Sequence, residues 1–107
     1  MLIDAFLDYL RLERNYSVKT IVSYRTDLLE FEEYFKKVDA ELDFTRADAN
    51  IVRNWMVNLM DDGRTATTVN RKLSSLRSFY RFLLKRKVVS VDPMVKVVGP
   101  KKKKPLP

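Results

Sequence analysis

The residues of this sequence best suited to chemistry are the cations and small hydroxyls of its second half. No acidic residue occurs between Gly63 and Val91. The cations of this span are Arg64, Arg71, Lys72, Arg77, Arg81, Lys85, Arg86 and Lys87. Guanidinium and ammonium groups among Ser and Thr hydroxyls can contact phosphates and base edges. They predict the binding of a polyanion, with nucleic acid as the leading candidate.

Charge is distributed unevenly along the chain. Residues 1–62 carry 8 Lys/Arg against 13 Asp/Glu, a net charge of −5, whereas residues 63–107 carry 13 against 1, a net charge of +12. Together they give the net charge of +7 of the whole sequence. Charge gathered on one element and one tail is typical of a face that binds polyanions.

Residues for catalysis or metal binding are scarce. The sequence contains no His and no Cys, which removes the commonest general base, the commonest metal ligand and thiolate chemistry. Tyr9 and Tyr16 have no base nearby in the sequence, and Asp61-Asp62 and the Glu30–Glu33 cluster fit a helix end and an exposed flank. We therefore expect no catalytic residue, no metal, no cofactor and no small-molecule substrate.

These residues must be positioned by helices. Only two Gly occur, at 63 and 99, and Pro appears only from Pro93 onward, so the 107 residues predict one all-α domain over 1–87 and a basic extended linker over 88–107. No apolar run is long enough for a membrane span and no signal peptide is evident, so we expect a cytoplasmic protein.

Apolar periodicity predicts four helices. Their expected ranges are 2–14, a second helix capped by Ser17 and ending near Lys37, a third capped by Thr45 and ending at Gly63, and a fourth capped by Thr65 and ending near Lys87. We expect the aromatic residues Tyr24, Phe31, Phe35, Trp55, Phe79 and Tyr80 to pack in the core rather than to stack on bases. The segment beyond residue 87 is expected to be extended and exposed.

A helical projection divides the fourth helix into two faces. The buried stripe is Val69, Leu73, Leu76, Tyr80 and Leu83, and the outward strip is Thr67, Arg71, Ser74, Ser78 and Lys85, bordered by Ser75 and Arg81. A second basic and hydroxyl-bearing patch starts the second helix with Ser17, Lys19, Thr20 and Ser23. The alternatives are an ordinary solvated helix face and an ordinary capped helix start.

Three blocks of sequence together resemble a known family. They are Ser17-Val-Lys-Thr20 with Tyr24 and Asp27-Leu28, then Gly63 with the run from Thr68 to Leu83, then Asp92-Pro93 and Pro100 to Pro107. In this order and spacing the chain resembles the N-terminal core-binding domain of tyrosine recombinases of the Xer and phage-integrase type.

The resemblance implies a compact four-helix, SAM-like domain that forms half of a C-shaped clamp on duplex DNA at a recombination core site. Its second and fourth helices would contact DNA through Lys19, Thr20, Ser23, Thr67, Thr68, Arg71, Lys72 and Ser75, although the projection places Lys72 near the core edge. Lys101 and Lys102 of the lysine run would follow phosphates, where a localisation signal or a solubilising tail is the alternative.

The resemblance also implies that the catalytic tyrosine, arginines, lysine and histidine belong to a C-terminal domain absent from this sequence. We therefore expect a fragment that binds DNA without cutting it, monomeric alone and joined by other recombinase protomers on DNA. The alternatives are a helical protein-interaction module, in which the basic face binds an acidic partner, and a small stand-alone DNA-binding regulator.

Overall fold

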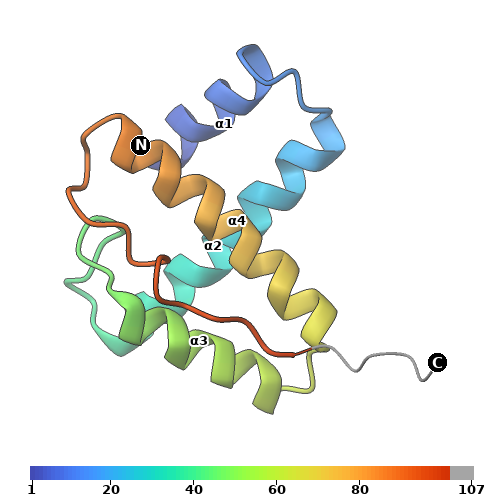
Figure 1. Ribbon diagram of the computed structural model, residues 1–107, viewed down its shortest axis with the longest axis vertical. Coiled ribbons are helices and arrows are strands. Elements are labelled where there is room, and N and C mark those ends of the chain that lie inside the picture. Colours follow the sequence, from blue (N-terminus) through green and yellow to red (C-terminus); the bar gives the residue numbers. More distant parts are fainter. Residues whose placement is uncertain (102–107) are drawn as a thin grey trace.

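The structure is a computed structural model that describes residues 1–101 and confirms the all-α prediction (Figure 1). The helices are α1 (Leu2–Leu12), α2 (Val18–Val38), α3 (Ala49–Asp61) and α4 (Ala66–Lys85). No strand occurs within residues 1–101. Within the same range, no helix has the length and apolar character needed to cross a bilayer.

The helix starts follow the expected capping chemistry at two of three positions. The hydroxyl oxygens of Ser17 and Thr65 accept hydrogen bonds from the backbone N–H groups of Thr20 and Thr68, both at 3.2 Å. The predicted Thr45 cap is wrong, because Asp48 accepts from the N–H of Ile51 and starts α3. Thr45 instead donates both its N–H and its hydroxyl to Asp43 in the preceding loop.

Three of the four helices end shortly before a residue with positive φ. Gly63, with φ 86°, terminates α3 as expected, and its N–H donates to the carbonyl of Met60. The fourth helix ends two residues before the predicted Lys87, because Lys87 itself adopts φ 61° and cannot continue the helix. Likewise α1 ends at Leu12 rather than residue 14, ahead of Asn15 with φ 53°.

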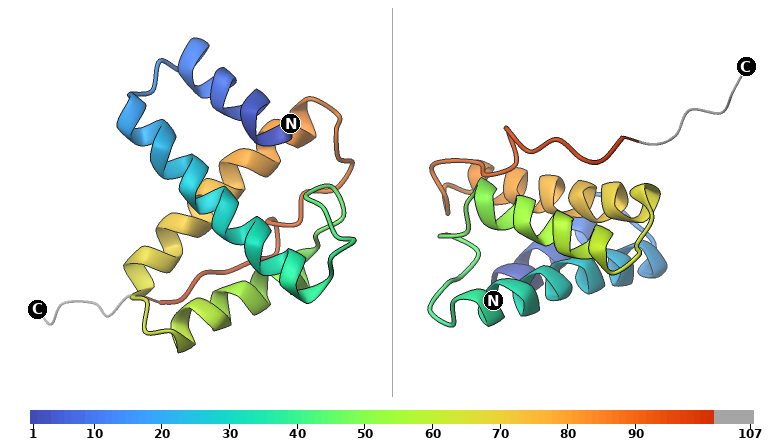
Figure 2. Two further views of the ribbon diagram at one scale, coloured as in Figure 1. Left: turned by 180° about the vertical axis from the view of Figure 1, so that it is seen from behind. Right: turned by 90° about the horizontal axis from the view of Figure 1, so that it is seen from below.

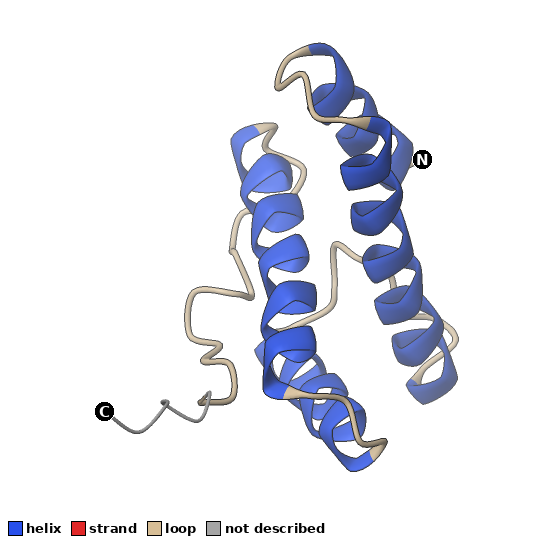
Figure 3. Cartoon of the chain, turned by 90° about the vertical axis from the view of Figure 1, so that its right-hand side faces the viewer, coloured by secondary structure: helices blue, strands red, loops and turns tan. Residues whose placement is uncertain are grey.

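The helices form two layers, one of α1 and α2 and the other of α3 and α4 (Figure 3). The shortest dimension of the molecule, 21 Å, matches two helices of about 10 Å diameter. In Figure 1, α2 and α4 cross as an X, and α1 lies between the N-terminal half of α2 and the C-terminal half of α4. The N-terminal ends of α2 and α4 therefore lie at the same edge of the molecule.

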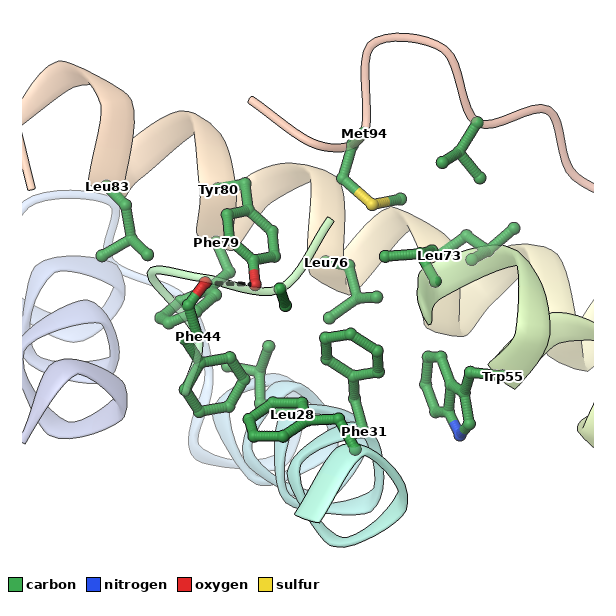
Figure 4. Packing of buried hydrophobic residues seen from close by; sticks show 14 of the residues in the cluster. Leu28, Phe31, Phe44, Trp55, Leu73, Leu76, Phe79, Tyr80, Leu83 and Met94 are labelled. Atoms are coloured by element: carbon green, nitrogen blue, oxygen red, sulfur yellow. Dashed lines mark hydrogen bonds between the residues drawn. The ribbon is translucent and has the colours of Figure 1, made fainter. Parts of the chain in front are cut away.

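The core fills the space between these layers (Figure 4). Five of the six aromatic residues expected in it are buried, and Tyr24 is partly buried against it. Phe44, from the loop before α3, inserts between Phe35 and Phe79 in edge-to-face contacts, with ring centroids 5.2 and 5.0 Å from theirs. The hydroxyl of Tyr80 donates to the Phe44 carbonyl at 2.7 Å. Burial and the nearby carboxylates raise the pKa of Tyr80.

The segment after α4 corrects the expectation of an exposed tail. It runs back along the outer side of the α3–α4 layer (Figure 2). Met94 and Val97 are only 3% and 4% exposed and belong to the core. A Cβ on Gly99 would clash with the Asn70 amide oxygen, so a larger residue here would displace the Asn70 side chain on α4. Met94 and Val97, three residues apart, therefore dock a segment that composition alone marks as a linker.

Candidate nucleic-acid interface

The first turns of α2 and α4 expose matching pairs of hydroxyls. The Ser17 hydroxyl donates to Thr20 Oγ1 at 3.0 Å, and the Thr65 hydroxyl donates to Thr68 Oγ1 at 3.1 Å. Neither first turn contains an acidic residue, so the partial positive charge of both helix N-termini is left uncompensated. Lys19 and Ser23 are exposed beside the Ser17–Thr20 pair. This end of the two-helix crossing is suited to anions.

The predicted faces of α4 are confirmed by burial. The whole stripe of Val69, Leu73, Leu76, Tyr80 and Leu83 is inaccessible to solvent. Thr67, Arg71, Ser74 and Lys85 are exposed, and Ser78 is partly exposed. The helix register deduced from the sequence is therefore correct.

A cleft of about 280 Å³ lies between α2 and α4. Its walls are Thr20, Ser23 and Tyr24 from α2 and Arg71, Ser74 and Ser75 from α4. Four of these six, Thr20, Ser23, Arg71 and Ser75, are predicted site residues, which the fold brings together from positions about fifty residues apart in sequence. Thr68, partly buried, and Thr67 lie one turn earlier on α4, outside this lining.

Beneath the cleft, a buried carboxylate connects the two helices. Asp27 of α2 is fully buried. Its Oδ2 accepts hydrogen bonds from Arg71 Nη1 and from the Ser75 hydroxyl, both at 2.7 Å, and its Oδ1 accepts one from Lys72 Nζ at 3.0 Å. Lys72 Nζ also lies 3.0 Å from Glu30 Oε2. Every buried side-chain nitrogen and oxygen of residues 1–101 has a partner, this cluster included.

This network changes the interpretation of three predicted site residues. Lys72 is 2% exposed and Ser75 5% exposed, so both lie inside the protein and stabilise the crossing of α2 and α4. Arg71 differs, because its side chain remains 52% exposed while one of its nitrogens is bound to Asp27. Of the three, only Arg71 presents donors to the outside.

The network also shows where the cations of α4 find partners. No acidic residue lies four positions away from them on the same helix. Partners are provided instead by α2, through Asp27 and Glu30. The sequence does contain a signal for Asp27, since it lies four residues before Phe31 and so shares the apolar stripe of α2.

A second hollow, of about 560 Å³, lies between α1 and the C-terminal half of α4. Its cationic lining residues are Arg14, Arg81, Lys85 and Arg86, against one carboxylate, Glu13. Arg86 lies over the Phe82 ring at 4.8 Å and Arg14 over the Tyr16 ring at 5.6 Å. Hydrogen bonding of the Arg14 guanidinium to Tyr9, and then the negative charge that Tyr16 gains at high pH, raise the pKa of Arg14. This hollow extends the positive surface away from the cleft.

The start of the lysine run lies close to α4. Asn70 Nδ2 donates to the Pro100 carbonyl at 2.9 Å, which places exposed Lys101 near the N-terminal end of the helix. Lys102, the other lysine expected to contact DNA, lies outside the described residues. The described part of the segment thus reaches the same edge as the cleft.

Comparison with known proteins gives one family match. The family described as "Phage integrase, N-terminal SAM-like domain" matches residues 3–87. Among curated proteins, the chain is 33% identical to "Tyrosine recombinase XerD" of Oceanobacillus iheyensis over 98% of its length. It is 39% identical to "Tyrosine recombinase XerC" of Staphylococcus aureus over 97% and 37% identical to that of Pelotomaculum thermopropionicum over 98%.

The match covers only part of those relatives. The chain spans 35%, 34% and 36% of their respective lengths, about a third in each case. No solved structure shows a significant match.

Proposed function

Because the chain belongs to the family of phage-integrase N-terminal SAM-like domains, we propose that it is a module that binds duplex DNA at a recombination core site. Contact is made by the N-terminal halves of α2 and α4. Lys19, Thr20 and Ser23 serve on α2, and Thr67, Thr68, Arg71 and Ser74 on α4. Lys72 and Ser75 act from beneath this surface by fixing the angle between the helices.

The observation that carries this proposal is the cleft that both helices line with hydroxyls and one arginine. Small hydroxyl side chains permit close approach to a DNA groove, and a guanidinium offers several donors in one plane. An enzyme pocket would be deeper and would hold titratable groups of altered pKa, whereas this cleft is shallow and contains neither His nor Cys. Duplex DNA fits it better than a small molecule does.

Phosphate binding is supported by the groups around the cleft. The uncompensated N-termini of α2 and α4 favour anions. Lys19 and Lys101 lie at this edge, and Arg81 and Lys85 continue along α4 beside the second hollow. These flanking cations supply affinity, since phosphate contacts dominate the binding free energy of most protein–DNA complexes.

We propose that the parent protein is a DNA breaking and rejoining recombinase, as the names of the relatives indicate. In that protein this module would hold one side of the core site and adjoin other protomers on DNA. Residues outside the 107 would perform strand cleavage. The 88–107 segment would be the connection to them, docked on α3 and α4 as far as Pro100.

A titration of the chain with fluorescent duplex DNA at several salt concentrations tests the proposal. If about 5 phosphates are neutralised, log K falls against log salt with a slope of about −4.5. Lys19→Ala should reduce the magnitude of that slope by about 0.9, since it removes one phosphate contact. A flat salt response would contradict DNA binding by this module.

Lys37→Ala provides the matched control. Lys37 is on the same helix but at its opposite, acidic end, where its Nζ pairs with Glu33 at 3.3 Å. The variant loses the same charge and should keep the slope of the unaltered chain. An equal reduction of the slope in Lys19→Ala and Lys37→Ala would show that binding depends on net charge and not on the proposed surface.

A further inference from the structure

The ion-pair cluster under the cleft is electrically balanced. Two cations, Arg71 and Lys72, face two carboxylates, Asp27 and Glu30, so the formal charge of the cluster is zero. A neutral cleft centre does not attract phosphate strongly, in contrast to the cationic surroundings of the second hollow. The centre of the cleft therefore has a different role from its edges.

Arg71 is held in a geometry that leaves donors free. Its Nη1 is bound to Asp27 at 2.7 Å, and its Nε and Nη2 have no hydrogen-bond partner among residues 1–101. Asp27 is fully buried and is itself fixed by Lys72 and Ser75, so it cannot follow a moving arginine. The guanidinium plane is thus oriented before any ligand arrives, which lowers the entropy cost of binding.

We propose that Arg71 is the base-reading residue of this module, donating to a guanine in the major groove, and that Asp27 is its positioning residue. This inference rests on the proposed function. An arginine contacts guanine O6 and N7 with two parallel donors, which an oriented guanidinium can supply and a lysine cannot. Thr20, Ser23 and Ser74, the hydroxyls around Arg71, leave room for the base edge.

The first test is the selection of duplexes from a pool of random sequence. The unaltered chain should enrich a consensus that contains a guanine on which binding depends. Arg71→Lys keeps the charge but loses the paired donors, so its discrimination at that guanine should fall by a factor between about 5 and about 150. Its affinity for unselected duplex should fall by a smaller factor than its discrimination, since the charge and the flanking phosphate contacts remain.

The second test separates positioning from simple stabilisation. Asp27→Asn leaves Arg71 in place but removes the charge that orients it, so the same guanine preference should be lost. Affinity for unselected duplex should not fall, because the flanking cations that contact phosphate are unaltered. Unfolding alone would lower both affinities in parallel. Glu33→Gln is the matched control, since it makes the same charge change at an exposed position of α2 and should alter neither affinity.

Asp27→Asn removes a buried carboxylate and could fail to fold. An independent measurement on the unaltered chain then decides the positioning role. A guanidinium pinned by a carboxylate rotates slowly and should give separate Nη–H signals for Arg71 in NMR spectra. Signals averaged by free rotation would overturn the positioning role of Asp27.

The outcomes also distinguish this inference from the proposal beneath it. Absence of any binding to duplex DNA would refute the proposed function and the inference with it. Binding without base preference, or a guanine preference that survives in Arg71→Lys, would overturn only the inference. Loss of the guanine preference in Arg71→Lys and in Asp27→Asn, but not in the Glu33→Gln control, would support both the proposed function and the inference.

Discussion

At the scale of single residues, short polar contacts determine loop conformations that the sequence pattern does not predict. Asp43 is an example in the loop before α3. Its Oδ1 accepts from the hydroxyl and N–H of Thr45 and from the N–H of Arg46, at 2.6, 2.9 and 3.1 Å. This turn directs the neighbouring Phe44 into the core, where its ring contacts Phe31, Phe35 and Phe79.

These contacts predict an acid-sensitive loop. The Thr45 hydroxyl first, and then the two N–H groups, lower the pKa of Asp43 below its ordinary value of 3.8. A carboxylate whose pKa is lower in the folded state stabilises the fold above 3.8, and that contribution is lost as the pH falls through the folded-state pKa. The Tm difference between the unaltered chain and Asp43→Ala should therefore be constant near neutral pH and shrink below 3.8.

Thr45→Val supplies the control for that measurement. It removes the strongest of the three hydrogen bonds while keeping the carboxylate, so the pKa of Asp43 should lie closer to 3.8 and the stability lost in acid should be smaller than in the unaltered chain. A Tm difference for Asp43→Ala that does not vary with pH would contradict the role assigned to this carboxylate.

At the scale of elements, α4 is covered on more sides than we expect for the last helix of a domain, because the segment that follows it packs against it. It packs against α2 and α3, and the 88–101 segment covers part of its outer side. Arg77 and Arg53 each donate to a backbone carbonyl of this segment, that of Val97 and that of Lys96. The segment therefore stabilises the helix that carries Arg71.

Docking of this segment predicts unequal effects for two neighbouring residues. Met94→Ala should lower the free energy of unfolding by about 2 to 5 kcal/mol, because it leaves a cavity at a core position that is 3% exposed. Val95→Ala, at a position 77% exposed, should change it by less than about 0.5 kcal/mol. Denaturant unfolding measures both. Two equally small effects would indicate that the segment is not docked on the core.

At the scale of the whole molecule, opposite charges occupy different regions. The acidic residues Glu32, Glu33, Asp39 and Glu41 outnumber Lys36 and Lys37 where α2 ends, whereas the proposed interface lies where α2 and α4 begin. Helix α2 thus has a basic, hydroxyl-bearing start and an end at which acidic residues are in excess. Phosphate should be attracted to one edge and repelled from the other.

This asymmetry predicts where a DNA duplex will perturb the backbone. Amide shift changes in NMR spectra should concentrate in residues 17–24 and 65–75 and spare the outward face of α3 and the C-terminal turns of α2. Changes centred on α3 would contradict the proposed interface. A control titration with a short acidic peptide should leave the 17–24 and 65–75 amides unchanged if the surface is specific for DNA.

The sequence by itself determined the four helices, the register of α4 and the family. Apolar spacing, the caps at Ser17 and Thr65 and the break at Gly63 are local signals, and short-range geometry is enough to interpret them. Burial in α4 follows the same spacing, so its two faces could be assigned without knowledge of the other helices.

Only the tertiary structure decided which of the candidate contacts remain accessible. The Asp27 cluster joins residues that are 44 to 48 positions apart, and Met94 and Val97 enter the core from beyond the last helix. Periodicity marks Asp27, Met94 and Val97 as positions suited to burial but does not reveal their partners, because each pairing depends on how separate elements cross in space. The charge of a residue can be deduced from the sequence, but whether it faces DNA or a buried carboxylate depends on the packing of α2 against α4.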